Sequence, residues 1–98
     1  GFDNRKFYFQ GFLPVKGREN ILKSLAEIKL PVILYESKYR VKKTLSELNK
    51  YFHGKNVSVS REMSKIHETT YRNRLDLLVK DLSRIKEKGE FVIVIDNS

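Results

Sequence analysis

The chain contains two short, unbroken runs of apolar residues, at positions 32–35 and 91–95. Runs of this kind, rich in Val and Ile, are typical of strands that are buried on both faces, as in parallel sheets. Around them, apolar residues recur at spacings of three and four, which is the pattern of amphipathic helices. Strands that alternate with helices predict an α/β fold, in which helices lie on the faces of a mixed, mostly parallel sheet.

The remaining segments complete the expected order of elements. Strand patterns also occur at 7–12, 56–61 and 67–72, and helix patterns at 17–28, 41–52 and 75–85. The expected order is β-α-β-α-β-β-α-β, with about five strands and three helices in a single layered domain of residues 1–98. The more polar strand at 67–72 is expected near an edge of the sheet.

Short polar residues and a glycine mark the expected helix ends. Ser37 is the expected N-cap of the second helix and Asn73 that of the third, because both side chains can accept hydrogen bonds from first-turn amides. Gly54 suits the left-handed position that ends the second helix.

Composition excludes several classes of protein. The net charge is +8, with 20 Lys and Arg against 12 Asp and Glu, and such an excess favours phosphate-rich partners. There is no cysteine, so disulfides and cysteine-based zinc sites are excluded. No apolar run approaches the roughly 20 residues that a membrane span needs, so a soluble, cytoplasmic protein is expected. The linker-like opening at 1–4, without an initiating Met, predicts an excised domain or a processed piece of a longer protein.

Charged residues gather at 60–68, directly after an alternating strand pattern. Strand ends are where α/β proteins build sites, and a glutamate beside a lysine can act as a base with an electrostatic partner. Glu62 and Lys65 are therefore the candidate catalytic pair. The alternative is an edge hairpin stabilised by ion pairs. A metal site is not expected, because the two histidines, His53 and His67, show no ligand spacing.

Two further segments have competing interpretations. Between a buried strand and a helix, 35–40 offers free helix amides that would suit an anion, or simply a capped helix in which Arg40 pairs with Glu36. The segment 11–14, with Gly11 and Pro14, is either a close backbone approach to a ligand or an ordinary strand end. No glycine-rich phosphate cradle occurs, so a self-contained nucleotide-cofactor site is not expected.

Four motifs together resemble one family. They are Gly11-Phe12-Leu13-Pro14, Tyr35-Glu36-Ser37-x-x-Arg40, Arg61-Glu62-Met63-Ser64-Lys65-Ile66-His67-Glu68 and Lys88-Gly89-Glu90-Phe91-Val92-Ile93-Val94-Ile95. In order and spacing they resemble the small-subunit ribosomal RNA 2′-O-ribose methyltransferases, within the tetrapyrrole (corrin/porphyrin) methylase superfamily. The resemblance covers nearly the whole chain and is to the C-terminal domain of a two-domain catalytic unit.

The resemblance implies a function that this chain would share with a missing domain. In the family, S-adenosyl-L-methionine lies in the cleft between the two domains, and the enzyme methylates a cytidine ribose of small-subunit rRNA. The N-terminal domain, with the glycine-rich part of the cofactor site, is absent here, so the fragment is expected to be inactive alone. The implied partners are the rRNA or ribosomal subunit, the missing N-terminal domain and a second copy in a homodimer.

The resemblance also implies roles for individual residues. On the cofactor side of the cleft it implies Pro14, Tyr35, Ser60, Arg61 and Glu62. The plausible RNA phosphate contacts are Arg40, Arg61, Lys65 and Arg72, which would position RNA without reading its sequence.

The chain departs from the family pattern at two motifs. Lys38 and Tyr39 replace a Pro-His pair, and 72–74 replaces Arg-Gly-Thr, which leaves substrate detail open. Two other functions remain alternatives: a non-catalytic basic domain that binds RNA or a protein partner, and a methylase of a tetrapyrrole or another small molecule.

Overall fold

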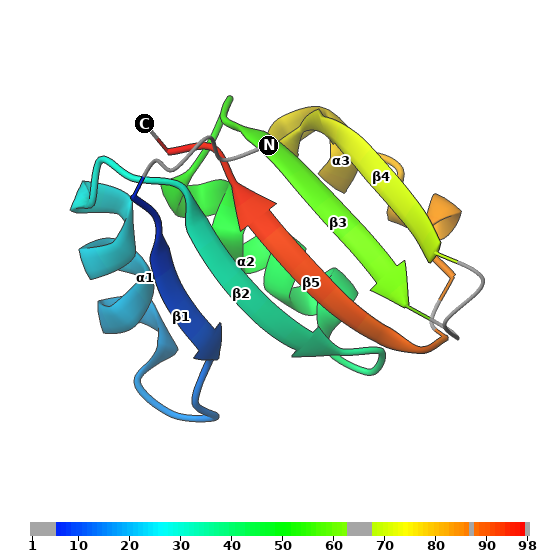
Figure 1. Cartoon of the computed structure of the whole chain (residues 1–98), viewed down its shortest axis with the longest axis horizontal. Coiled ribbons are helices and arrows are strands. Elements are labelled where there is room, and N and C mark those ends of the chain that lie inside the picture. The colour runs from blue at the N-terminus through cyan, green and yellow to red at the C-terminus, as the bar shows by residue number, and fades with distance from the viewer. Residues whose placement is uncertain (1–5, 63–67, 87, 98) are drawn as a thin grey trace.

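The computed structural model describes residues 6–62, 68–86 and 88–97, and for residues 62, 68 and 69 it describes the backbone alone. The elements follow the expected order (Figure 1). They are β1 (Tyr8–Phe12), α1 (Arg18–Glu27), β2 (Val32–Ser37), α2 (Val41–Tyr51), β3 (Asn56–Glu62), β4 (Glu68–Arg74), α3 (Leu75–Val79), a 3-10 turn (Leu82–Arg84) and β5 (Glu90–Ile95). The prediction of a five-stranded mixed sheet with three helices is confirmed.

The prediction that the sheet is mostly parallel is wrong. The strand order is β1-β2-β5-β3-β4, and only β1 and β2 pair in parallel. Strand β5 lies between β2 and β3 and is antiparallel to both, while β3 and β4 form an antiparallel hairpin with β4 at the edge, as expected. The unbroken apolar runs suggested parallel strands because they imply apolar surface on both faces of the sheet, but that property does not determine strand direction.

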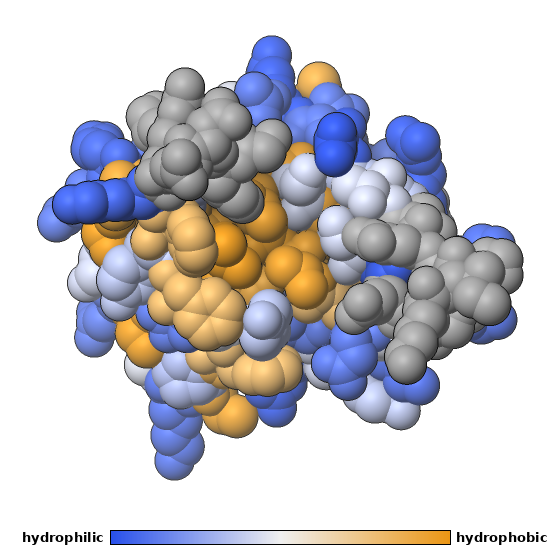
Figure 2. All heavy atoms as spheres, in the orientation of Figure 1, coloured by the Kyte–Doolittle hydropathy of each residue, from blue (hydrophilic) through white to orange (hydrophobic). Residues whose placement is uncertain are grey.

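Helices cover one face of the sheet, so the expectation of helices on its faces is only half right. In Figure 1 all three helices lie behind the sheet. The core between the two layers includes Leu22 and Leu25 of α1, Leu45 and Leu48 of α2, and inward-facing residues of every strand except β1 and β4. Along β2 and β5, buried residues alternate with more exposed ones. The uncovered side, here called the open face, carries apolar side chains over β1, β2 and β5 (Figure 2).

A bulge in β1 places two phenylalanines on this open face. Phe9 pairs with Ile33, and the register then shifts so that Phe12 pairs with Tyr35. Gly11 lies at the shift with a φ of 75°, which a side chain would strain. Without the extra residue, Phe9 and Phe12 would lie on opposite faces, since side chains alternate along a strand. The glycine therefore serves a strand irregularity.

Two expected caps are wrong, because strands extend further than predicted. Ser37 is the last residue of β2, and α2 begins four positions later without a side-chain cap. Asn73 lies within β4, where its Oδ1 accepts a hydrogen bond from the amide of Arg74. Gly54 has the expected positive φ, 82°. The third helix is also shorter than predicted, because the chain turns at Asp81 before the 3-10 segment.

Arg74 and Asp76 form an ion pair where α3 begins. The guanidinium donates to both carboxylate oxygens, at 3.1 and 2.7 Å. These hydrogen bonds lower the pKa of the Asp76 carboxyl from its ordinary value. The Arg74 side chain is 53% exposed, so the pair fixes local geometry more than it stabilises the fold.

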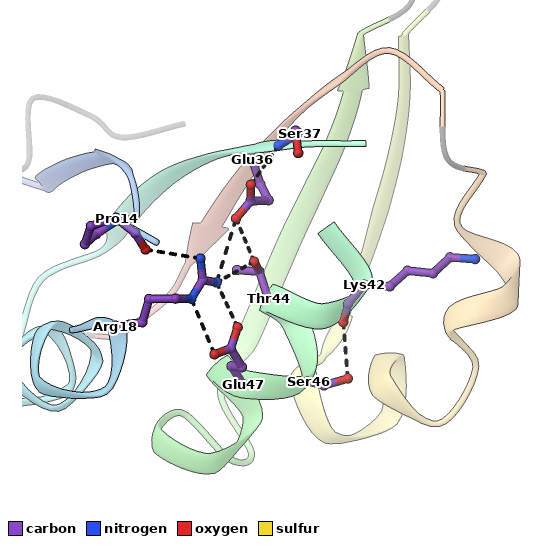
Figure 3. Close-up of polar contacts among 8 residues, drawn as sticks. All are labelled: Pro14, Arg18, Glu36, Ser37, Lys42, Thr44, Ser46 and Glu47. Atoms are coloured by element: carbon purple, nitrogen blue, oxygen red, sulfur yellow. Dashed lines mark hydrogen bonds and ion pairs between the residues drawn. The ribbon is translucent and has the colours of Figure 1, made fainter. Parts of the chain in front are cut away.

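An ionic network joins α1, α2 and β2 (Figure 3). Arg18 Nη2 lies 2.8 Å from Glu47 Oε1 and 2.8 Å from Thr44 Oγ1, to which it donates. The Thr44 hydroxyl in turn donates to Glu36 Oε2 at 2.6 Å. Glu36 is only 4% exposed, and a buried carboxylate is tolerated only when donors surround it. Thr44 therefore relays between a cation and a buried anion.

The same network also fixes two segments of backbone, one at the end of β2 and one in the loop after β1. The second Glu36 oxygen accepts from the backbone amide of Ser37 at 2.8 Å, and Arg18 Nη1 donates to the Pro14 carbonyl at 3.4 Å. The end of β2 and the loop after β1 are thus tied to one guanidinium (Figure 3).

A side chain near the end of the chain caps the first helix. Asn97 is buried, and its amide nitrogen donates to the carbonyls of Leu25, Ala26 and Ile28. The last carbonyls of a helix have no partner within it, so an outside donor satisfies groups that would otherwise be orphaned. Asn97 thereby fixes the C-terminal end of α1 against the end of β5.

Replacing Thr44 should weaken the fold through the buried network. Thr44→Val keeps the shape but removes the hydroxyl that donates to Glu36, and we expect it to lower the free energy of unfolding by about 2 kcal/mol. Urea titration followed by circular dichroism measures this. Ser46→Ala is the matched control, because Ser46 Oγ only donates to the Lys42 carbonyl within the same helix. Equal losses in both variants would contradict a specific role for the network.

Replacing the donor group of Asn97 with an acceptor should destabilise the fold more than Thr44→Val does. Asn97→Asp places acceptors against three carbonyl oxygens, and we expect a loss of about 3 kcal/mol near neutral pH. The pKa of the new carboxyl would be raised in the folded state, so the deficit should shrink as the pH falls from 7 to about 4. Thermal melts at several pH values test this, with the exposed Asn73→Asp as control. A deficit that does not vary with pH would argue against capping.

Candidate functional site

The carboxyl ends of three strands meet at one edge of the sheet. Strand β1 is parallel to β2, and β2 and β3 share a direction because both are antiparallel to β5. Their arrowheads accordingly lie along the same side in Figure 1. The ends of these strands carry the residues that the sequence singled out as a site, so this carboxyl edge is the candidate functional site.

Tyr35 and Ser60 lie in the same row on the open face. Each pairs with Val92, from the two sides of β5. The Tyr35 ring contacts Phe12 edge-on, with centroids 5.6 Å apart, and the Ser60 hydroxyl lies 3.3 Å from that of Thr70. Pro14 follows two residues after β1, in the loop held by Arg18. The structure thus brings a flat ring and a hydroxyl to one side of the carboxyl edge.

Arg61 faces the other way. It belongs to the row of Glu36 and Phe91, which the helices cover, and it is 8% exposed. Neighbouring residues of a strand point to opposite faces, so Arg61 and Ser60 do not share a surface. The expected contacts of Arg61 with the cofactor and with RNA stay predictions. Its burial disfavours direct contact with RNA more than contact with the cofactor.

Glu62 is the last residue of β3 and lies in the row of paired residues nearest the carboxyl edge. Its backbone pairs with Glu90 on one side and Glu68 on the other. The side chain of Glu62 and the whole of Lys65 lie outside what the structure describes, so their catalytic role stays a prediction. Reasoning from the sequence missed Glu90 as a site residue, although it belongs to the motif at 88–95. Only the antiparallel pairing of β5 places it beside Glu62.

The two remaining arginines are exposed, at different parts of the site. Arg40 immediately precedes α2, close after the end of β2. It does not pair with Glu36 as expected, since Thr44 and Arg18 hold that carboxylate. Arg72 lies on β4 opposite Ser58, on the polar flank of the open face. Both arginines are exposed and therefore accessible to phosphate.

The chemistry of the row suits an adenosine group better than a metal. A tyrosine ring and apolar neighbours can pack against a purine, while hydroxyls can bind its polar edges. Among the residues that the structure describes, no three His, Cys, Asp or Glu side chains are grouped to bind a metal ion. Within the same residues, no helix is long and apolar enough to cross a membrane. A hollow between β1 and α1, lined in part by Tyr8, Ile21 and Ile28, lies away from the carboxyl edge.

Curated relatives match this chain almost from end to end. It is 34% identical over 105 residues to ribosomal RNA small subunit methyltransferase I of Helicobacter pylori, an alignment that covers 99% of this chain and 36% of that protein. Proteins of the same name from Thermotoga maritima and a Synechocystis species are 32% and 35% identical, with 43% and 35% of their lengths covered. The chain therefore spans well under half of the length of these relatives. No protein-family model matches it.

A solved structure supports the fold. Diphthine synthase superposes with a TM-score of 0.58 over 91% of this chain and 39% of that protein, at 13% identity. At such low identity the likeness concerns the fold alone. The resemblance noted in the sequence is confirmed: over nearly its whole length this chain is similar to part of the ribosomal RNA small subunit methyltransferase I proteins, and it shares the fold of diphthine synthase.

Proposed function

We propose that this chain is the C-terminal domain of an S-adenosyl-L-methionine-dependent methyltransferase that modifies the 2′-hydroxyl of a cytidine in small-subunit rRNA. The observation that carries the proposal is the row at the carboxyl edge, where Tyr35 and Ser60 lie on the same side of the sheet next to Glu62. A second domain of the same protein would face this edge and complete the cleft. Such an enzyme would act in the cytoplasm, where ribosomal subunits are found.

Each residue has a proposed task in binding. Tyr35 and Ser60, together with Pro14, would hold the adenosine part of the cofactor. Arg40 and Arg72 would bind phosphates of the RNA, which orients the substrate without reading its bases. The net charge of +8 would draw RNA toward the domain.

The chemistry needs positioning and removal of one proton. When bound, S-adenosyl-L-methionine supplies a methyl group activated by its sulfonium. Transfer of that methyl group would join it to the ribose 2′-oxygen and release S-adenosylhomocysteine, so the protein would have to align the ribose and remove one proton. Alignment of the reacting atoms contributes most of the acceleration. Glu62 would accept the hydroxyl proton, while Lys65 would stabilise negative charge that develops on the oxygen.

Binding of S-adenosylhomocysteine tests the division of the site between domains. We expect the full-length protein to bind it by calorimetry, and this 98-residue chain to bind at least about tenfold more weakly, because half of the cleft is missing. Equal affinity would contradict the shared cleft. No binding by the full-length protein would favour the alternative of a basic RNA-binding domain.

Substitution in the full-length enzyme tests the catalytic pair. Glu62→Gln and Lys65→Met should each lower kcat for methylation of small ribosomal subunits by about 100-fold. The affinity for S-adenosylhomocysteine should change much less. Glu19→Gln and Lys23→Met, at exposed positions of α1, are controls of matched charge. If the product contains no 2′-O-methylcytidine, or if kcat is unchanged in both variants, these assignments are wrong.

A further inference from the structure

The Arg18 guanidinium reaches two stretches of backbone that carry residues of the proposed cofactor site. Its Nη1 donates to the carbonyl of Pro14 at 3.4 Å. Its Nη2 donates to Thr44 Oγ1 at 2.8 Å, and that hydroxyl donates to Glu36. Glu36 directly follows Tyr35 in β2, so one side chain connects the two segments that would hold the adenosine part of the cofactor (Figure 3).

Arg18 lies on the side of the sheet that the helices cover, away from the surface that would bind the cofactor. It is the first residue of α1, and its side chain is 10% exposed. Its partner Glu36 is buried under the helices, while the neighbouring Tyr35 faces the open face, because successive residues of a strand point to opposite sides. Any effect of Arg18 on the cofactor therefore passes through the backbone that it holds.

The guanidinium is itself held in one orientation. Glu47 of α2 accepts hydrogen bonds from its Nε at 3.4 Å and from its Nη2 at 2.8 Å. Because the guanidinium is planar, these two bonds also fix the direction in which Nη1 points. The bond to the Pro14 carbonyl is long and would be weak on a mobile side chain, but here its donor is fixed by α2.

Stability alone is a poor explanation for a charged network at this place. The side chains of Arg18 and Glu36 are 10% and 5% exposed, and their charged atoms lie 3.9 Å apart. Ion pairs as buried as this one often contribute no more net stability than apolar residues of the same volume, because both charges lose their hydration. A satisfied polar network does, however, specify one arrangement of the groups that it joins. This one specifies the arrangement of two segments at the carboxyl edge.

We propose that Arg18 is a positioning residue of the cofactor site, which fixes the 13–17 loop, between β1 and α1, relative to Tyr35. The inference rests on the proposed function, because it concerns the same site. Affinity for the adenosine part of a ligand depends on how well Pro14 and Tyr35 are placed before binding. Without the guanidinium the loop loses its connection to α2 and β2, while the proposed catalytic groups, Glu62 and Lys65, are unchanged.

Binding of S-adenosylhomocysteine to variants of the full-length protein tests the proposal. Arg18→Lys keeps the charge but lacks the planar fork, and Arg18→Met keeps only an apolar stem. By calorimetry well below the melting temperature, we expect both to raise the Kd at least about fivefold, because the site is less pre-organised. The KM for S-adenosyl-L-methionine should rise in parallel, while kcat at saturating cofactor stays within about twofold.

Asn97→Ala is the matched control for a loss of stability. Asn97 is another buried donor to α1, but it binds carbonyls at the C-terminal end of that helix, next to the end of β5. The end of β5 pairs with the start of β2, so it lies at the opposite edge of the sheet from the candidate site. We expect this variant to melt at a lower temperature and to bind S-adenosylhomocysteine as the wild type does. An equal loss of affinity in the Asn97 and Arg18 variants would reduce the effect to general destabilisation and refute the proposal.

Limited proteolysis of the full-length protein gives a measurement that needs no cofactor. Lys16 is exposed in the 13–17 loop, and Lys29 is exposed between α1 and β2. Trypsin should cleave after Lys16 at least about threefold faster in Arg18→Lys than in the wild type, relative to cleavage after Lys29, because proteolysis follows local opening. Each rate is divided by that of the same bond in the unfolded chain. An unchanged ratio would refute the proposal, and Arg18→Lys decides alone if Arg18→Met does not fold.

The wild-type protein separates this inference from the function on which it rests. If the full-length wild type does not bind S-adenosylhomocysteine, the proposed function fails, and the inference fails with it. If the wild type binds and Arg18→Lys binds equally well, the planar fork does not position the site. The inference is then wrong while the proposed function stands.

Discussion

The pairing of β5 on both of its sides is the constraint on which the rest of the sheet depends. Strand β5 joins the β1–β2 pair to the β3–β4 hairpin, along six residues on each side. Two-stranded units are marginal alone, so neither half would be stable without it. Because β5 is antiparallel to both neighbours, β2 and β3 run in the same direction, and their carboxyl ends meet at one edge. The candidate site therefore exists because β5 lies between β2 and β3. Since β5 is also the last element, the sheet closes only through long-range contacts, which slow folding.

Periodicity predicted the elements because it reports which residues are buried. In the helix pattern at 41–52, apolar residues recur at spacings of four and three, and all four of them are in the core: Val41, Leu45, Leu48 and Phe52. The contacts that hold the layers together leave no such local signal. Arg18 meets Glu47 across 29 positions, and Asn97 caps a helix whose end lies about 70 positions earlier. An isolated Asn or Arg in a sequence carries no mark of such a partner, so these contacts required the structure.

Strand register decides which predicted site residues act together. Sequence reasoning placed Ser60, Arg61 and Glu62 at one strand end, and β3 does end there. Because alternate residues face opposite sides, Ser60 joins Tyr35 on the open face while Arg61 joins Glu36 under the helices. A motif read as a continuous string thus divides into two surfaces. The same register brings Glu90, about 30 positions away, beside Glu62. The local sequence identified the candidate residues, and strand pairing across β5 determines which of them share a face of the sheet.

The unbroken apolar runs carried more information than their first interpretation allowed. They correctly indicated that both faces of β2 and β5 are apolar, and the error was to assume that helices of this chain cover both. A face bearing Phe9, Phe12 and Tyr35 would favour aggregation if it stayed in water. The bulge at Gly11, where glycine adopts a positive φ without strain, turns both phenylalanines to that face. The apolar runs therefore specify both the core under the helices and the exposed apolar surface of the open face.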